Sequence, residues 1–145
     1  MPKSSNLAAE FYVASLLFRL GYNTTLTLGN TKEIDLIVYN EKTKETITVD
    51  VKGLKGTTSW FMPDNEKLLE RETHFFVLVT FKNKITQSDI VPEVYVIPSK
   101  KVRGLLETWH SKKDKKSVNG ITYKNIKNHP ELNGAQGFKQ LFGQG

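Results

Sequence analysis

Two carboxylates and a lysine in the first half of the chain have types and a spacing that suit metal-ion chemistry. Asp50 and Lys52 lie in residues 46–52, where even positions are polar and odd positions are apolar. This alternation predicts a β-strand with both side chains on one face, roughly 6.6 Å apart along the strand. Asp35 is near the start of another strand-like segment, residues 33–39. In an antiparallel hairpin the start of the first strand lies beside the end of the second, so Asp35 is expected next to Asp50 and Lys52.

The register of this hairpin can be examined from the sequence. If Asp35 were directly opposite Asp50, the connecting loop would be Lys42 and Thr43, a poor composition for a tight two-residue turn. A longer loop, or a one-residue offset with a bulge, is therefore favoured. The two carboxylates are expected to be close in either case.

Neighbouring carboxylates repel each other unless a proton or a cation lies between them. Mg²⁺ resolves such repulsion because it takes oxygen ligands, commonly one or two carboxylates together with waters and a substrate phosphate. Lys52 would then lie within reach of that phosphate or of an attacking water. The hairpin alone is equally compatible with a solvated polar face on which Lys52 neutralises Asp50.

Glu10 is conspicuous in a predicted amphipathic helix over residues 7–20, which Gly21 is expected to end. Helical periodicity places Glu10 between Ala14 and Leu17, within the apolar arc of the helix. A carboxylate in that position needs a partner, because burying it unpaired costs several kcal/mol. A buried ion pair with a lysine, or a side chain long enough to reach the surface, is the structural alternative. The predicted arc consists of Leu7, Phe11, Val13, Ala14, Leu16, Leu17, Phe18 and Leu20.

The remaining pattern predicts one α/β domain over residues 1–145. Its core is expected over about residues 5–110, with a basic C-terminal extension over about residues 111–145. The expected order is helix, three strands, helix, two strands, helix. In chain order these elements are residues 7–20, 23–28, 33–39, 45–52, 64–72, 75–81, 93–97 and 100–110, with a loop at 57–63.

Composition narrows the classes of function. The chain of 145 residues has a formal net charge of +6, which favours a polyanionic partner such as nucleic acid. It contains no cysteine, so disulfides, thiol catalysis and zinc–thiolate sites are excluded. The apolar runs are only as long as strands, and the N-terminus lacks the features of a secretory signal. We therefore expect an intracellular, cytoplasmic protein without a membrane partner.

Taken together, Glu10, Asp35 and the run Val49-Asp50-Val51-Lys52-Gly53 resemble the PD-(D/E)XK nuclease pattern. Ile34 stands where the superfamily's name has a proline, a position that is loosely kept. The resemblance covers residues 7–81. It implies a restriction-endonuclease-like core, in which helices flank a mixed central β-sheet, and hydrolysis of phosphodiester bonds in DNA with Mg²⁺ or Mn²⁺.

The resemblance also implies roles for individual residues. Asp35 and Asp50 would be metal ligands, and Glu10 would complete or tune the metal site, as in small Holliday-junction resolvases. Lys52 would orient or deprotonate the attacking water and stabilise the developing charge. Members of this size often act as dimers, so a homodimer is left open. Candidate DNA contacts outside this catalytic set are Lys55, Trp60 with its neighbour Phe61, and the basic run Lys112, Lys113, Lys115 and Lys116.

Each of these candidates has a plainer interpretation. Lys55 and the basic run are equally expected in solvated loops, and aromatic residues near a loop are more often part of a small core. Two alternatives to an endonuclease also remain: a catalytically inactive nucleic-acid-binding module with the same fold, and a structural helix–hairpin domain in which Glu10 pairs with Lys52.

Overall fold

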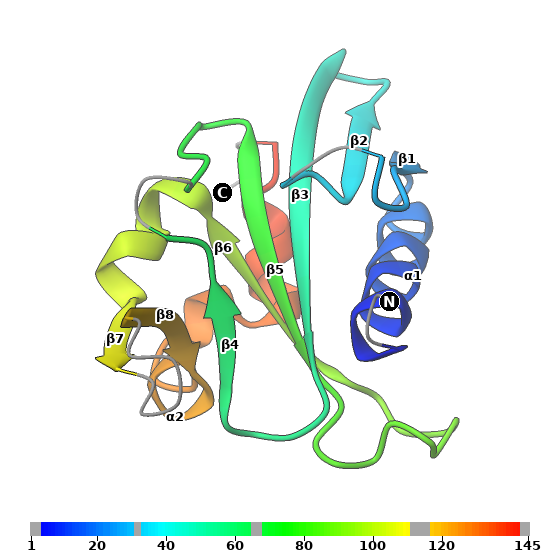
Figure 1. Ribbon diagram of the computed structural model, residues 1–145. Helices are drawn as coiled ribbons and strands as arrows, with labels where there is room; N and C mark the ends of the chain where they lie inside the picture. Colours follow the sequence, from blue (N-terminus) through cyan, green and yellow to red (C-terminus); the bar gives the residue numbers. More distant parts are fainter. Residues whose placement is uncertain (1–3, 31–32, 65–67, 111–116, 143–145) are drawn as a thin grey trace.

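The computed structural model describes residues 4–30, 33–64, 68–110 and 117–142. Within them the chain is a mixed α/β protein (Figure 1). Its elements are α1 (Ser4–Arg19), β1 (Asn23–Leu26), β2 (Leu36–Asn40), β3 (Glu45–Leu54), β4 (Ser59–Met62), β5 (His74–Thr80), β6 (Glu93–Pro98), the 3-10 helix η2 (Ser99–Leu105), β7 (Glu107–His110), β8 (Ser117–Thr122), α2 (Tyr123–Ile126), η3 (Pro130–Leu132), α3 (Gly134–Gly137) and η4 (Phe138–Gln140).

The strands form two sheets. The larger sheet has five strands in the order β1-β2-β3-β5-β6, and the smaller has three in the order β4-β8-β7. Only the β3–β5 pair is parallel; every other pairing of these strands is antiparallel. The five-stranded sheet is therefore mixed, as the resemblance implied.

Strand β5 separates two apolar cores. All seven of its residues are buried, which explains the almost unbroken apolar run that predicted a strand covered on both faces. Phe75, Val77 and Val79 pack in a core that includes α1 and the end of the described chain. Phe76 and Leu78 alternate with them and pack in a second core with β4, β8 and η2. Figure 1 shows α1 on one side of the large sheet and β4, β7 and β8 on the other.

Helix α1 buries a narrower stripe than its sequence predicted. Ala9, Val13 and Leu17 are fully buried against the sheet, but Phe11 and Phe18 are more than half exposed although both fall in the predicted arc. Ala14 is also buried, and this narrow stripe suffices because α1 packs on only one face of the sheet. No described helix is long and apolar enough to cross a membrane.

The predicted helix over residues 100–110 is wrong in its second half. The 3-10 helix η2 ends at Leu105, Leu106 is extended, and residues 107–110 form strand β7. The apolar residues that suggested one helical face are divided between η2 and β7. Strand β7 forms because it pairs with β8, a partner that local sequence patterns do not reveal.

The segment between β3 and β5 also differs from expectation. Residues 57–63 contain strand β4 instead of only a loop, because β4 pairs with β8 across a long sequence separation. The predicted helix over residues 64–72 is wrong where it can be followed, since residue 64 and residues 68–72 are not helical.

The C-terminal part of the chain is not an appended extension. Its described residues, 117–142, contain β8, α2 and α3, and they contribute buried apolar side chains to both cores. These side chains are Ile121, Ile126, Leu132, Leu141 and Phe142.

Candidate functional site

The candidate site lies where strand β2 stops and strand β3 continues. β2 pairs with β3 only from Asn40–Glu45 to Leu36–Val49. The remaining half of β3, residues 50–54, has no described strand on that side, and α1 runs alongside it instead (Figure 1).

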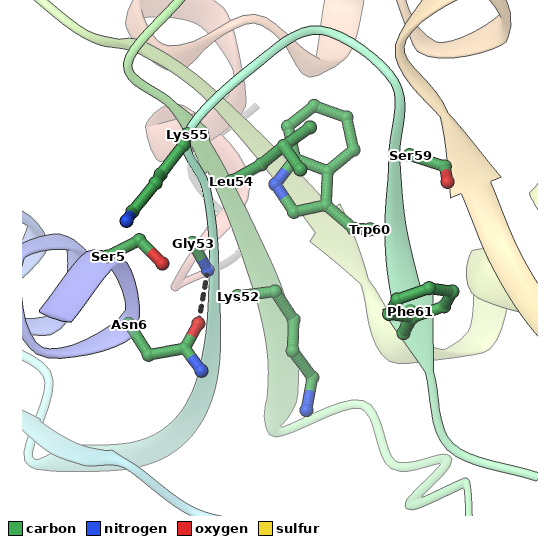
Figure 2. A pocket seen from close by; sticks show the side chains of 9 residues that line it. All are labelled: Ser5, Asn6, Lys52, Gly53, Leu54, Lys55, Ser59, Trp60 and Phe61. Carbon is green, nitrogen blue, oxygen red and sulfur yellow. Dashed lines mark hydrogen bonds between the residues drawn. The ribbon is translucent and has the colours of Figure 1, made fainter. Parts of the chain in front are cut away.

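Two side chains take the place of the missing strand. The Val51 N–H donates to Asp35 Oδ2 at 2.7 Å, and the Gly53 N–H donates to Asn6 Oδ1 at 3.0 Å (Figure 2). These N–H groups are two residues apart and so point to the same edge of the strand. The backbone of β3 is thereby hydrogen-bonded while the Asp50 and Lys52 side chains line a pocket.

Gly53 allows α1 to approach the strand closely. A Cβ atom at this position would lie 2.3 Å from the carbonyl oxygen of Ser5, much closer than any real Cβ contact. Gly53 therefore lets the first turns of α1 rest on the β3 backbone, which brings Asn6 and Glu10 to the site. The strand predicted over residues 45–52 continues through Gly53 to Leu54.

The backbone of Asp35 is fixed from both sides. Its N–H donates to the carbonyl of Val49 at 2.8 Å, and its carbonyl accepts from the N–H of Thr27 at 2.9 Å. The β2–β3 register, in which Tyr39 faces Thr46, ends at the Leu36–Val49 pair, and the Asp35 N–H bonds to this same Val49. The sequence favoured a longer loop or an offset; residues 41–44 form the longer loop, and the bond from Asp35 to Val49 departs by one residue from the strand register.

Asp50 is the most deeply buried carboxylate of the site, with 2% of its surface exposed. Its Oδ1 lies 3.3 Å from Nζ of Lys52, whose side chain is partly exposed. The pKa of Asp50 is raised to about 7: burial is the largest cause, Lys52 acts to lower the pKa, and the nearby Asp35 carboxylate acts to raise it. The lysine therefore does not fully compensate the cost of burying this charge.

Glu10 faces the same carboxylates from α1 and is 7% exposed. Burial is the main cause that raises its pKa to about 7, followed by the charge of Asp35, a hydrogen bond between the two side chains and the charge of Asp50. Glu10 and Asp50 therefore both have pKa values close to neutral pH. The cluster thus retains a proton at pH values where isolated carboxyl groups have lost theirs.

All four predicted catalytic residues line one pocket of about 330 Å³: Glu10, Asp35, Asp50 and Lys52. The ion pair of Lys52 is with Asp50, which differs from the alternative in which Lys52 pairs with Glu10. Asn6 and Glu33 also line the pocket and were not predicted, because an isolated polar residue ahead of a helix or strand carries no signal of its own.

The donor set suits a hard divalent cation, although its oxygens are engaged in other contacts. Among the described residues, no group of three or more His, Cys, Asp or Glu side chains is arranged to hold a metal ion directly. One Asp35 oxygen accepts from Val51, and one Asp50 oxygen faces Lys52. Burial, together with mutual repulsion, raises the pKa values of two of the three carboxyl groups. Three neighbouring carboxylates match the oxygen ligands that Mg²⁺ prefers, provided that a cation replaces the bound proton.

The other predicted contacts fall in three different settings. Lys55 is exposed and lines a groove next to the acidic pocket. The prediction that Trp60 could stack on a base is corrected, because its ring is 2% exposed and its Nε1–H donates to the carbonyl of Val79 at 3.0 Å. Its neighbour Phe61 is 63% exposed. The basic run Lys112, Lys113, Lys115 and Lys116 lies outside the described residues.

A second carboxylate–lysine cluster lies on β6 and is built differently. The Glu93 carboxylate accepts hydrogen bonds from the hydroxyls of Tyr95 and Tyr123, both at 2.8 Å, and its other oxygen lies 3.3 Å from Nζ of Lys82. Burial acts to raise the pKa of Glu93, but these donors outweigh it, and the pKa is lowered. This carboxylate is stabilised in its charged form.

Comparison of the chain with protein-family models, curated proteins and solved structures gave no match.

Proposed function

We propose that this chain is a metal-dependent endonuclease that hydrolyses phosphodiester bonds in DNA, with Mg²⁺ or Mn²⁺ as cofactor. The observation that carries the proposal is the meeting of Glu10, Asp35, Asp50 and Lys52 in one pocket. Two of these carboxyl groups have pKa values raised to about 7, a perturbation that is common at functional sites.

The fold supports the finer assignment of a restriction-endonuclease-like core. The mixed sheet carries α1 on one face, and the antiparallel β2–β3 pair brings Asp35 beside Asp50. The same arrangement places Glu10, a carboxylate in an apolar stripe, next to the polar groups of Asp35, Asp50 and Lys52.

The chain's own groups have distinct tasks in this proposal. Asp35, Asp50 and Glu10 would hold the cation, which supplies an activated water and neutralises charge on the phosphate. Lys52 presents an ammonium group at the pocket and stabilises the negative charge that develops on the phosphoryl oxygens. Water adds to phosphorus, the bond to the leaving oxygen breaks, and that oxygen takes up a proton. The raised pKa values of Glu10 and Asp50 suit groups that exchange a proton near neutral pH.

The direct test is a cleavage assay on supercoiled plasmid and on a synthetic four-way junction, with Mg²⁺ or Mn²⁺. Wild type is expected to nick or cut, and Asp50→Ala is expected to be inactive. Asp89→Ala is a matched control, because Asp89 is exposed and lies outside the pocket. Equal rates for wild type and Asp50→Ala would overturn the proposal.

The alternative of a catalytically inactive DNA-binding module is favoured by one contact. Lys52 already neutralises Asp50 in part, as expected of a site that no longer needs a cation. This alternative predicts tight DNA binding that Mg²⁺ does not change and that never yields nicks. A binding titration with and without Mg²⁺, followed by gel analysis of the same samples, separates the two functions.

A further inference from the structure

A second groove opens directly beside the acidic pocket. It has a volume of about 680 Å³, within the range of clefts that hold a small molecule. Lys52 and Asn6 line both cavities, so the groove and the pocket meet at these two residues. Figure 2 shows the groove between the start of α1 and the end of β3 on one side and strand β4 on the other.

The groove combines cationic, hydroxyl and aromatic groups. Lys55, Ser5 and Ser59 line it together with Lys52. In Figure 2 Lys55 lies beside Ser5, and Phe61 lies across from them on β4. Ammonium and hydroxyl groups are the usual partners of backbone phosphates, and an exposed ring is a usual partner of a base.

The Phe61 side chain lies next to another aromatic ring on one side and is exposed to solvent on the other. Its ring centroid lies 6.4 Å from that of Trp109 on β7. Trp109 can reach this position because Gly120, the strand partner of Phe61, has no side chain; a Cβ there would lie 2.6 Å from the Trp109 ring. A supported ring that remains 63% exposed is a preformed platform for stacking.

We propose that this groove binds an unpaired nucleotide of a DNA strand, next to the phosphodiester that the acidic pocket cleaves. In an intact duplex the faces of a base are covered by its neighbours, so an aromatic ring can stack only on a base that has left the helix. The substrate class is therefore single-stranded DNA or an unpaired segment at a branch or flap. This inference rests on the proposed function.

The test measures binding separately from cleavage. The full chain, kept in EDTA, is titrated into a labelled oligo(dT) strand and into a duplex of equal length, and fluorescence anisotropy is recorded. Wild type is expected to bind the single strand more tightly. Phe61→Ala is expected to lower that affinity about tenfold, because stacking on one base is lost. Phe61→Trp is expected to retain it.

Phe18→Ala is the matched control, because Phe18 is similarly exposed and lines neither cavity. It is expected to bind like wild type. In a second measurement, Lys55→Ala is expected to weaken binding and to reduce its salt dependence by about one phosphate contact.

Three results would overturn the inference: tighter binding of the duplex, unchanged single-strand affinity in Phe61→Ala, or an equal loss in Phe18→Ala. The proposed function is judged separately by plasmid and junction cleavage with Mg²⁺. Cleavage by wild type without any dependence on Phe61 rejects the groove alone. Phe61-dependent binding without cleavage rejects hydrolysis and supports the groove as a binding site.

Discussion

The two carboxylate–lysine clusters of this chain contain similar residues but shift the pKa of their carboxyl groups in opposite directions. At Glu93, two tyrosine hydroxyls and Lys82 all favour the charged carboxylate, and its pKa is lowered. At Asp50, a single lysine pairs with one of three neighbouring carboxyl groups, and the pKa values of Asp50 and Glu10 are raised to about 7. A carboxylate surrounded by donors stabilises a fold, whereas carboxylates that face each other remain ready to bind a proton or a cation.

The sharpest way to test this contrast is Asp50→Asn. We expect DNA cleavage to fall by at least about a hundredfold, because a proposed ligand of the cation is removed. The free energy of unfolding at pH 8 is expected to stay within about 1 kcal/mol of wild type, since a repelling buried charge is lost along with the Lys52 contact. Cleavage assays and urea unfolding on the same samples measure both quantities. A large loss of stability would show that Asp50 serves the fold, as Glu93 does.

The pH dependence of stability should have opposite signs at the two clusters. Asp50 and Glu10 have pKa values near 4 when unfolded and about 7 when folded. The folded state therefore binds more protons between these values, and its stability is greatest below about pH 4 and falls as the pH rises to about 7. Glu93 contributes stability above its unfolded pKa and loses it as the pH falls through its lowered folded pKa.

The expected loss from Asp50 alone between pH 4.5 and 7.5 is on the order of 3 kcal/mol. It is measured as the difference between the stability curves of wild type and Asp50→Asn, in which the titrating groups outside the acidic pocket cancel. Adding Mg²⁺ at pH 7.5 should restore part of the loss in wild type but not in the variant. Parallel curves for the two proteins would contradict the assignment of the raised pKa values.

Gly53→Ala should displace residues of the acidic cluster without replacing any of their side chains. The added Cβ would meet the Ser5 carbonyl, so the first turns of α1 must move away and carry Glu10 and Asn6 with them. We expect a loss of about 2 kcal/mol in the free energy of unfolding, together with reduced cleavage. Gly104→Ala is the matched control, because nothing lies within 4 Å of its added Cβ. Thermal unfolding of both variants tests this, and equal melting temperatures would contradict the close approach.

Glu93→Gln is expected to have the smallest effect and only on stability. Both tyrosine hydroxyls donate to the same oxygen, so the amide oxygen can still accept from both, but the ion pair with Lys82 and the charge assistance of the hydrogen bonds are lost. A loss of about 1 kcal/mol at pH 7 with unchanged cleavage is expected. Reduced cleavage in a variant that remains folded would mean that the two clusters are not independent.

Local sequence patterns predicted the acidic pocket better than they predicted the fold around it. Alternating polarity placed Asp50 and Lys52 on one face, and helical periodicity marked Glu10 as a carboxylate among apolar residues. These signals are short-range, and each requires only the geometry of one strand or one helix. The meeting of all four residues in one pocket followed from a single hairpin and one packed helix.

The parts that were not predicted depend on partners distant in the sequence. The pairing of β4 and β7 with β8 turned an expected loop and half of an expected helix into strands. It also buried Trp60, whose environment comes from the second core and not from its neighbours in the chain. Asn6 gave no signal because its role exists only once α1 lies against Gly53.

The capped edge of β3 also bears on how the protein avoids self-association. A strand that extends beyond its neighbour would normally present free N–H groups to which another chain could add a strand, a common route to aggregation. Here the Val51 and Gly53 N–H groups are already bonded to Asp35 and Asn6, and α1 covers the same edge. The side chains that shape the acidic pocket thereby also close this half of β3 against intermolecular strand pairing.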